Sequence, residues 1–459
     1  MASALPFLDN ENPDIAEIEE RIRALSISTP EKAETAKKEE TPRQEEIRLI
    51  PLCLLVDELV NYKEEFRCKH DEIVRRGHAL EQIMLLHQEK LIAEDKLVYW
   101  LKLGQLYSMT KKDKQPAIDA LSKVVKLDPS MPDAWNTMAE CYWQGGDYDM
   151  AQKCLENSLK QVRCRVPLRN LSVICRKLAL KYPDRTPLFL QAGIDLAKEA
   201  VDKDVKDGIS WGILGNAYLS AYFNLNNDVT CAKLALSAYK QAVKLSTTNN
   251  AELFYNQAFA NKYCEIYEDA LIALDNAIAL ENDWEQAIKL RIELLSFLNK
   301  VQYFHSSLGK QKPKRLAKLQ KDLQNLQIAP FMKSLKAEPI SVGSLQIGEN
   351  HKVFIYGKVI WSSPQENSFP FTCGCLEATG LIFVITIYNL TPGKGFLIGD
   401  TVFVPHPNYK MVNFHYKGKL YKFPSLRVDN PTVLIVNKKR LTMDYFTPYA
   451  MNTSEKEDA

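Results

Sequence analysis

The sequence predicts two architectures in one chain, an all-α solenoid of helical hairpins followed by a small all-β barrel. A helical motif with a fixed spacing of aromatic, aliphatic and small residues recurs through much of the first two thirds of the chain. The last third contains short β-branched and aromatic runs that are separated by turn residues. A helical period in one region and short, punctuated runs in another are typical of separate helical and sheet domains.

The helical motif is clearest at residues 207–223, which read DGISWGILGNAYLSAYF. Trp211, Leu214, Gly215 and Tyr218 have the W-x2-L-G-x2-Y spacing of the first helix of a tetratricopeptide repeat. Residues three, four and seven positions apart share one face of a helix, so the large side chains form a packing stripe. The glycine lets the partner helix approach closely. This stretch therefore predicts one helical hairpin of a repeat.

The motif recurs along the chain. Copies begin at Trp100 and Trp135, which are 35 residues apart, against a repeat length of about 34. A degenerate copy contains Phe254, and residues 166–204 form an eroded copy that lacks the tryptophan. We predict a tetratricopeptide solenoid over residues 46–327, with the helices before Trp100 capping its open end.

Composition sets limits on the rest of the chain. Residues 1–45 are rich in Glu, Lys, Pro, Ser and Thr without a sustained apolar period, so we expect a disordered tail there and a second one at 443–459. There is no signal peptide and no apolar run of membrane-spanning length, which predicts a soluble intracellular protein with reduced thiols and no membrane partner. The net charge of +2 does not by itself indicate nucleic-acid binding.

The β-rich region follows a linker at residues 328–340. Its runs, such as KVFIYGKVIW and LIFVITIYNL, and its closely spaced turns predict an antiparallel barrel over residues 341–442. The segment 397–402, LIGDTV, resembles the entry into a strand of an oligonucleotide/oligosaccharide-binding (OB) fold. Six aromatic residues of the region can either stack nucleic-acid bases or fill the barrel core, and we favour the core: Phe354, Tyr356, Trp361, Phe383, Phe414 and Tyr416.

Motifs for catalysis are missing from the sequence. It has no phosphate-binding glycine loop, no H-E-x-x-H and no G-x-S-x-G. Cys373 and Cys375 form a lone C-x-C, which is a poor zinc site. We therefore predict a non-enzymatic protein without a metal or cofactor.

Binding residues are expected on the concave face of the solenoid, which the first helices of successive repeats line. Aligning Leu171 and Cys175 with the apolar stripe of the eroded repeat places Arg176 on that face. The residues expected to face the groove include Asn136, Glu140, Trp143, Arg176, Asn216, Glu252, Tyr255, Phe259 and Lys262. An arginine, amides, carboxylates and aromatic rings suit a short charged peptide in an extended conformation.

The densest basic segment reads LGKQKPKRLAKLQK, at residues 308–321. It contains Lys310, Lys312, Lys314, Arg315, Lys318 and Lys321. A solvated linker is one interpretation. Contact with nucleic-acid phosphates is the other, because clustered cations gain free energy by releasing counterions.

Several segments together resemble the tetratricopeptide repeat protein 5 (Strap) family. They are AWNTMAECYWQGGD (134–147), RNLSVICR (169–176), DGISWGILGNAYLSAYF (207–223), LSAYKQA (236–242), FPFTCG (369–374) and YKGKLYKF (416–423). The resemblance covers about residues 50–440 and implies a solenoid followed by an OB fold. It also implies recognition of the first residues of nascent tubulin, Met-Arg-Glu-Ile or Met-Arg-Glu-Cys, at the ribosome. The resemblance further implies that such recognition promotes decay of the translated mRNA through an mRNA-decay adaptor.

The resemblance also implies functional positions. The arginine of the family's groove falls on Arg176, and an acidic residue falls on Glu252, where the family has Asp. A second acidic position is occupied by Gln286, which is a departure from the family pattern. The family's ribosome-facing lysines fall on Lys312 and Lys314.

Two other interpretations stay open. The family is also described as a nuclear, stress-responsive cofactor of histone acetyltransferase complexes in the DNA-damage response, which implies both cytoplasmic and nuclear locations. In that setting the solenoid would be a scaffold and the barrel would bind DNA or protein. The other interpretation, a clamp for C-terminal carboxylates, ranks last because no basic pair accompanies Asn136 and Asn216.

Overall fold

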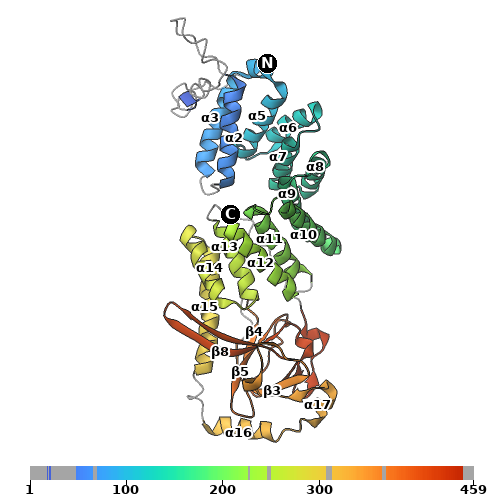
Figure 1. The fold of residues 1–459 in the computed structure, drawn as a ribbon, viewed down its shortest axis with the longest axis vertical. Coiled ribbons are helices and arrows are strands. Elements are labelled where there is room, and N and C mark those ends of the chain that lie inside the picture. Colours follow the sequence, from blue (N-terminus) through green and yellow to red (C-terminus); the bar gives the residue numbers. More distant parts are fainter. Residues whose placement is uncertain are drawn as a thin grey trace. The chain divides into compact units, whose positions relative to one another are not determined.

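The computed structural model describes residues 18, 20–21, 48–65, 70–225, 228–245, 250–306, 313–363 and 369–447 (Figure 1). The predicted tail at 1–45 lies outside this set except for Ile18, Glu20 and Arg21, which are helical. Ile18 is buried, and the Arg21 guanidinium lies 2.6 Å from the Glu58 carboxylate. At the other end, the described chain continues past residue 442 to Thr447, whose backbone N–H donates to the carbonyl of Asn389.

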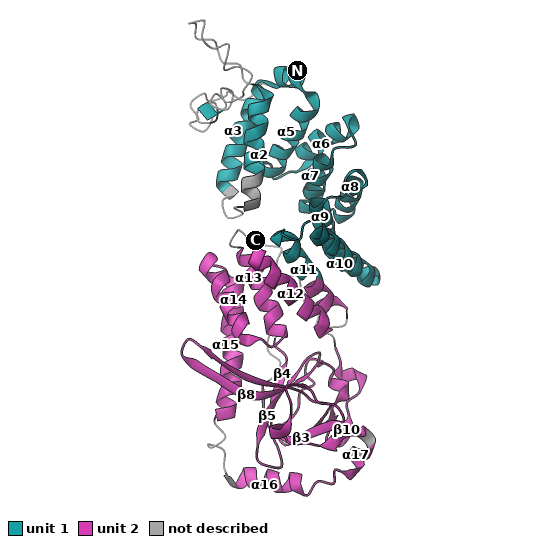
Figure 2. Ribbon diagram, viewed as in Figure 1, with its two compact units in different colours: residues 1–217 teal, residues 218–459 magenta. Residues whose placement is uncertain are grey.

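The chain forms two compact units, residues 1–217 and 218–459 (Figure 2). The division falls inside the repeat array, so the last repeats belong to the same unit as the barrel. The domain borders expected from the sequence follow fold type instead, and they stay predictions.

The first unit consists of paired helices. They are α2 (Leu49–Glu65), α3 (His70–Leu86), α4 (Gln88–Glu94), α5 (Lys96–Thr110), α6 (Gln115–Leu127), α7 (Pro132–Gln144), α8 (Tyr148–Gln161), α9 (Arg165–Lys181), α10 (Thr186–Lys203) and the first part of α11 (Gly208–Asn224). Helices α5 to α10 form three consecutive hairpins that share one apolar core. The predicted solenoid is confirmed.

The repeat motif has a visible physical basis. A Cβ atom on Gly104 of α5 would lie 2.6 Å from the Leu121 side chain of α6, so only glycine permits this helix spacing. The indole N–H of Trp135 donates to the carbonyl of Pro129 at 2.9 Å, and that of Trp211 donates to the carbonyl of Val205 at the same distance. In these two repeats the tryptophan therefore ties the preceding loop to the first helix.

The second unit contains the last helices and the sheet. The helices are α12 (Val229–Leu245), α13 (Ala251–Tyr263), α14 (Tyr267–Leu280), α15 (Glu285–Ser306), α16 (Pro313–Gln324) and α17 (Ala329–Leu335). The strands are β1 (Glu338–Pro339), β2 (Gly348–Glu349), β3 (Val353–Ser363), β4 (Phe371–Leu376), β5 (Ile382–Ile387), β6 (Thr401–Pro405), β7 (Asn408–Tyr416), β8 (Lys419–Val428), β9 (Ile435–Val436) and β10 (Lys439–Arg440).

The strand order is β10-β9-β6-β3-β4-β5-β8-β7-β2. The long strand β3 pairs with both β4 and β6, and β5 pairs with β8 in parallel, while β7 and β8 form an antiparallel hairpin. Buried side chains from β3, β4, β5, β6 and β8 fill the interior. The all-β domain predicted for this region is confirmed.

The barrel aromatics are packing residues. Phe383 lies in the barrel interior, and Phe354 packs under the segment around α17. Trp361 stacks on Phe304 of α15, with ring centroids 5.0 Å apart, and a Cβ atom on Gly374 would lie 2.1 Å from the same Phe304 ring. Helix α15 therefore covers this face of the sheet. The interpretation as barrel core is right for Phe383 alone, because Phe414, Tyr416 and Phe354 are buried in clusters outside the barrel interior and Tyr356 and Trp361 are only partly buried.

Candidate functional site

Arg176 lies on α9, in the first unit. The packed face of this helix carries the buried residues Leu171, Ile174, Cys175 and Leu178, and Arg176 is half-buried beside them. Burial raises the pKa of the Cys175 thiol to about 12, and the neighbouring Arg176 charge opposes only part of that rise. The Arg176 guanidinium therefore belongs to a helix whose other side packs in the core of the first unit.

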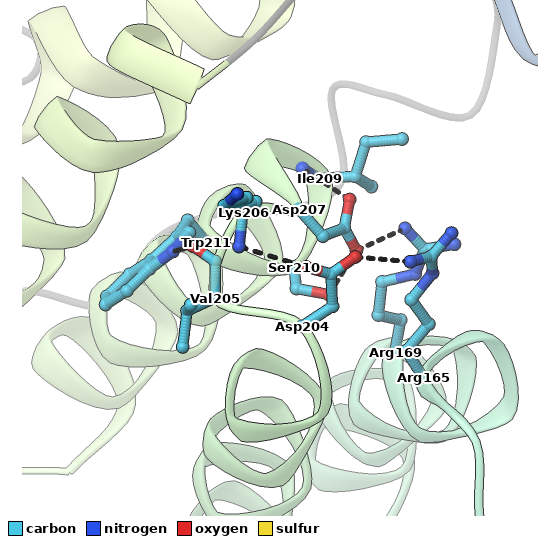
Figure 3. A network of polar contacts seen from close by, with 9 residues as sticks. All are labelled: Arg165, Arg169, Asp204, Val205, Lys206, Asp207, Ile209, Ser210 and Trp211. Atoms are coloured by element: carbon cyan, nitrogen blue, oxygen red, sulfur yellow. Dashed lines mark hydrogen bonds and ion pairs between the residues drawn. The ribbon is translucent and has the colours of Figure 1, made fainter.

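A polar network fixes the orientation of α9 (Figure 3). Arg169 pairs with Asp207 at 3.0 Å, and both side chains are only 11% exposed. Arg165 pairs with Asp204 at 2.5 Å, and the Ser210 hydroxyl donates to Asp207. Arg169 and Arg176 are seven residues apart, which places them on the same side of the helix. Because Arg169 is held at the start of α11, the side of α9 that carries Arg176 is fixed as well.

Two amides of the first unit were expected to line the groove. Asn136 on α7 is 9% exposed, and its buried Oδ1 atom has no hydrogen-bond partner within the described part of the chain. Asn216 on α11 is half-buried. A buried amide oxygen without a donor is destabilising, and protein atoms cover the Asn136 Oδ1 atom, so a ligand N–H group does not reach it in this structure.

The second unit carries Glu252 and Gln286. Both are exposed, and each lies in the first turn of its helix, α13 and α15 respectively. The rings of Tyr255 and Trp284 lie 4.8 Å apart and join these two helix starts. Glu252 and Gln286 therefore lie within one turn of a common aromatic pair, which the sequence did not indicate.

The expectation that Phe259 and Lys262 face the groove is wrong. Their exposed fractions are 7% and 3%, because neighbouring helices and the barrel cover them. The Lys262 ammonium lies 4.2 Å from the ring centroid of Phe369, which precedes β4, and 4.9 Å from that of Tyr263. The spacing within α13 gave no information about a cover contributed by a segment more than 100 residues later in the chain.

The basic segment is described only in part. Lys310 and Lys312 lie outside the described residues. Lys314 and Arg315 are exposed at the start of α16, and Lys318 and Lys321 are exposed further along it. The opposite side of α16 carries Leu316, Leu319 and Leu323, which are partly or fully buried. The helix therefore presents a cationic face while its apolar face packs.

The described residues provide neither a metal centre nor a membrane-spanning helix. Within the ranges described above, no cluster of three or more His, Cys, Asp or Glu side chains could hold a metal ion. None of the described helices combines the length and the apolar character needed to cross a membrane. Cys373 and Cys375 are buried in the barrel, where burial raises the pKa of the Cys375 thiol well above its usual range.

Comparison with known proteins gives the family. Residues 336–449 match the family model described as the tetratricopeptide repeat protein 5 OB fold domain, and residues 111–163 match a tetratricopeptide repeat model. The chain is 34% identical over 405 residues to tetratricopeptide repeat protein 5 of Bos taurus, covering 84% of this chain and 92% of that protein.

Two further relatives bear the same name. The Homo sapiens protein is 33% identical over 405 residues, with the same coverage, and the Mus musculus protein is 36% identical over 349 residues, covering 73% of this chain and 79% of that protein. Among solved structures, the tetratricopeptide repeat protein YrrB is similar over 44% of this chain and 95% of its own, at 21% identity and a TM-score of 0.32. From the identity and coverage of its mammalian relatives, the chain belongs to the tetratricopeptide repeat protein 5 family.

Proposed function

We propose that this protein is an adaptor that binds the amino terminus of nascent tubulin at the ribosome and promotes decay of the mRNA being translated. The observation that carries the proposal is Arg176, a guanidinium held half-buried on a helix whose orientation a polar network fixes. A guanidinium can bind a carboxylate through two parallel hydrogen bonds, which suits the glutamate of a Met-Arg-Glu terminus.

The arginine of the peptide needs an acidic partner. Glu252 is exposed in the first turn of α13, and Glu285 is exposed beside Gln286 at the start of α15. Gln286 can accept a hydrogen bond from a guanidinium but adds no negative charge. Glu252 is therefore the principal partner in this proposal, with Gln286 as a neutral hydrogen-bond acceptor.

Contact with the ribosome is assigned to the basic segment. Lys314 and Arg315 project from the exposed face of α16, and Lys310 and Lys312 precede them in the sequence. Cations grouped on one side of a helix suit ribosomal RNA phosphates, and such contacts weaken as salt rises. A bound ribosome and peptide would together position an mRNA-decay adaptor.

The first test is a fluorescence titration of the purified protein with labelled Met-Arg-Glu-Ile. We expect binding that is lost with Met-Arg-Lys-Ile and with Arg176→Ala. The matched control is Arg185→Ala, which removes an exposed arginine whose guanidinium lies 3.6 Å from Asp184. Equal loss in the control variant, or binding of both peptides, would contradict the role of Arg176.

The alternative is a nuclear scaffold of histone acetyltransferase complexes, with the protein present in both cytoplasm and nucleus. Its barrel would bind protein or duplex DNA rather than stack bases, because the candidate aromatic residues are packed in cores. No binding of Met-Arg-Glu-Ile, with or without ribosomes, would favour this alternative.

A further inference from the structure

From the second unit we infer that one rim of the barrel is a docking surface for a protein partner, which presents an acidic peptide segment with aliphatic side chains. The surface joins residues 397–400, which precede β6, to residues 437–440, which form the turn after β9 and strand β10 (Figure 2). We call it the barrel rim. The inference does not depend on the proposed function.

The Asp400 carboxylate holds the two segments of the barrel rim together. Its Oδ2 atom accepts a hydrogen bond from the backbone N–H of Leu397 at 2.8 Å, and its Oδ1 atom accepts one from the side-chain amide of Asn437 at 2.7 Å. The backbone N–H of Thr401 donates to Asn437 Oδ1, and the backbone N–H of Asn437 donates to the carbonyl of Thr401, both at 2.9 Å. The two segments therefore form one surface at the start of β6.

One side of the barrel rim is apolar. Leu397 and Ile398 are 74% and 55% exposed, although the preceding residue, Phe396, is buried in the barrel interior. A single exposed aliphatic residue is ordinary on a protein surface. Two neighbouring aliphatic residues rimmed by charged groups are more typical of an interaction site.

The other side of the barrel rim is cationic, and its exposed residues are Lys438, Lys439 and Arg440. None of these three forms an ion pair with a residue that the structure describes. The nearby carboxylates are already engaged, since Asp400 accepts two N–H groups and Asp444 lies 2.6 Å from the Lys394 ammonium. The rim therefore carries an excess of positive charge, whereas the net charge of the whole chain is only +2.

Lys438 has a backbone conformation that favours glycine. Val436 pairs with Lys439 across Asn437 and Lys438, whose φ angles are +47° and +69°, so these two are the central residues of a tight hairpin turn. Asparagine is favoured at the first of these positions and glycine at the second. A lysine at the second position strains the backbone, and such strain persists mainly where the side chain has a function.

The chemistry of the partner follows from both sides of the barrel rim. Carboxylates pair with lysine and arginine, and aliphatic side chains can remove Leu397 and Ile398 from water. An acidic segment with aliphatic residues satisfies both requirements. Nucleic-acid phosphates would neutralise the cations but leave the two aliphatic side chains exposed. Helix α16 differs in this respect, because its leucines pack inward and its exposed face is cationic.

The test measures the fluorescence anisotropy of three labelled octapeptides with the full-length protein. The first is Asp-Glu-Asp-Leu-Ile-Asp-Glu-Asp, the second has Ser in place of Leu and Ile, and the third has Lys in place of every acidic residue. We expect the first to bind at least about tenfold more tightly than the second, because burial of an aliphatic side chain accounts for that factor. We expect no detectable binding of the third. Equal binding of the two acidic peptides, or no binding of the first, would overturn the inference.

Two variants assign the binding to the barrel rim, each with a matched control. Leu397→Ser should raise the Kd of the first peptide about tenfold. Ile347→Ser, which changes a 79% exposed residue before β2 at the other end of the strand order, should change it less than about twofold. Lys439→Glu should raise the Kd at least about fivefold, whereas Lys422→Glu, at an exposed position of β8, should not. Equal losses in variants and controls would overturn the assignment.

Lys438→Gly separates the charge of this residue from its effect on the fold. Glycine adopts the left-handed conformation freely, so the unfolding temperature should stay the same or rise. The Kd of the first peptide should nevertheless rise about threefold, because one cation is lost. An unchanged Kd would contradict the role of Lys438.

The same variants distinguish other occupants of the barrel rim. An eight-nucleotide RNA might compete for the cations; tighter binding of that RNA than of the first peptide, lost with Lys439→Glu but not with Leu397→Ser, would overturn the inference. A dimer in sedimentation analysis that Leu397→Ser dissociates would assign the rim to a second copy of this chain, and it would also overturn the inference. Binding of the first peptide without competition from Met-Arg-Glu-Ile would support a docking surface separate from the proposed peptide site.

Discussion

The turn after α7 and the turn after α13 have the same backbone geometry but different residues at their strained position. After α7, the N–H of Gly146 donates to the carbonyl of Trp143, and that of Asp147 donates to the carbonyl of Tyr142. After α13, the N–H of Glu265 donates to the carbonyl of Lys262, and that of Ile266 donates to Asn261. Both are Schellman motifs, which require a left-handed residue after the helix.

Glycine and glutamate meet this requirement at different costs. Gly146 has φ +79°, and Glu265 has φ +56°. The left-handed region costs a residue with a Cβ atom about 1–2 kcal/mol, whereas glycine adopts it freely. Nothing lies within 4 Å of a Cβ atom placed on Gly146, while the Glu265 carboxylate accepts a hydrogen bond from Tyr388 of the barrel. The chain tolerates strain where the side chain fastens a second domain.

The largest expected effect comes from the arginine that completes the junction at Glu265. The Arg427 side chain is 8% exposed and lies 3.8 Å from Glu265 and 2.8 Å from Asp429. Arg427→Leu leaves Glu265 buried without its cation, and we expect a loss of about 3–5 kcal/mol in the free energy of unfolding in urea.

The control for this prediction is an exposed pair in the first unit. Arg163 and Glu199 lie 2.6 Å apart with 56% and 32% of their side chains exposed. Arg163→Leu should cost less than about 1 kcal/mol, because solvent screens such pairs. Similar losses in both variants would show that the junction contributes nothing beyond a surface ion pair.

The next prediction concerns Lys262. Its backbone carbonyl accepts a hydrogen bond in the turn after α13, as the carbonyl of Trp143 does in the turn after α7. Burial lowers the pKa of Lys262 from 10.5 to about 7, and Glu293 opposes part of this shift. Between pH 7 and 10.5 the unfolded chain therefore binds more protons than the folded chain, so the free energy of unfolding rises with pH across that window. Below pH 7 the buried Lys262 is charged, and its full destabilising effect on the folded state is present.

Lys262→Met removes the charge and keeps the packing volume. The lowering of the Lys262 pKa from 10.5 to about 7 corresponds to a destabilisation of the folded state of at most about 5 kcal/mol. The aromatic rings around the ammonium offset part of this destabilisation through cation–π contacts. We expect the variant to be more stable than the parent by about 2–3 kcal/mol at pH 7 and to lose about half of that advantage by pH 9.5. The measurement is urea unfolding at both pH values, and an advantage that does not change with pH would contradict the predicted titration.

The sequence was sufficient for the parts of the fold that local spacing determines. The helices around Trp100, Trp135 and Trp211 follow from a repeated stripe, and Gly104 meets Leu121 as the motif requires. The β-rich runs likewise predicted the barrel. Such features depend on residues within one repeat or hairpin, so the sequence displays them directly.

Contacts between distant segments could not be predicted. The spacing in α13 placed Phe259 and Lys262 on one side of the helix, but the cover at that end includes Phe369. Glu265 is an ordinary residue in the sequence, and its left-handed conformation becomes intelligible only beside Tyr388 and Arg427. Positions such as Arg176 and Glu252 were expected from the repeat register and the family resemblance. Their role in binding stays a prediction.

The smallest expected effects come from substitutions at Gly146 and Glu265. They distinguish the cost of the left-handed backbone from the stabilisation by the side-chain hydrogen bond. Gly146→Ala should cost about 1 kcal/mol, because the strained conformation is retained and no new contact forms. Glu265→Ala loses the hydrogen bond to Tyr388 and keeps the strain, whereas Glu265→Gly loses the bond and relieves the strain. We expect costs of about 2–3 and about 1–2 kcal/mol respectively, measured by urea unfolding.

The difference in the free energy of unfolding between Glu265→Ala and Glu265→Gly should therefore equal the cost of Gly146→Ala. Each measures what alanine costs, relative to glycine, at the left-handed position of a Schellman motif. In a Tyr388→Phe background the cost of Glu265→Gly should fall, because the hydroxyl that donates to Glu265 is already gone. If alanine and glycine at 265 are equally stable, the strain at Glu265 is relieved by the surrounding structure. The two turns would then differ in backbone energy as well as in sequence, and Glu265 would be kept for its contacts at no conformational cost.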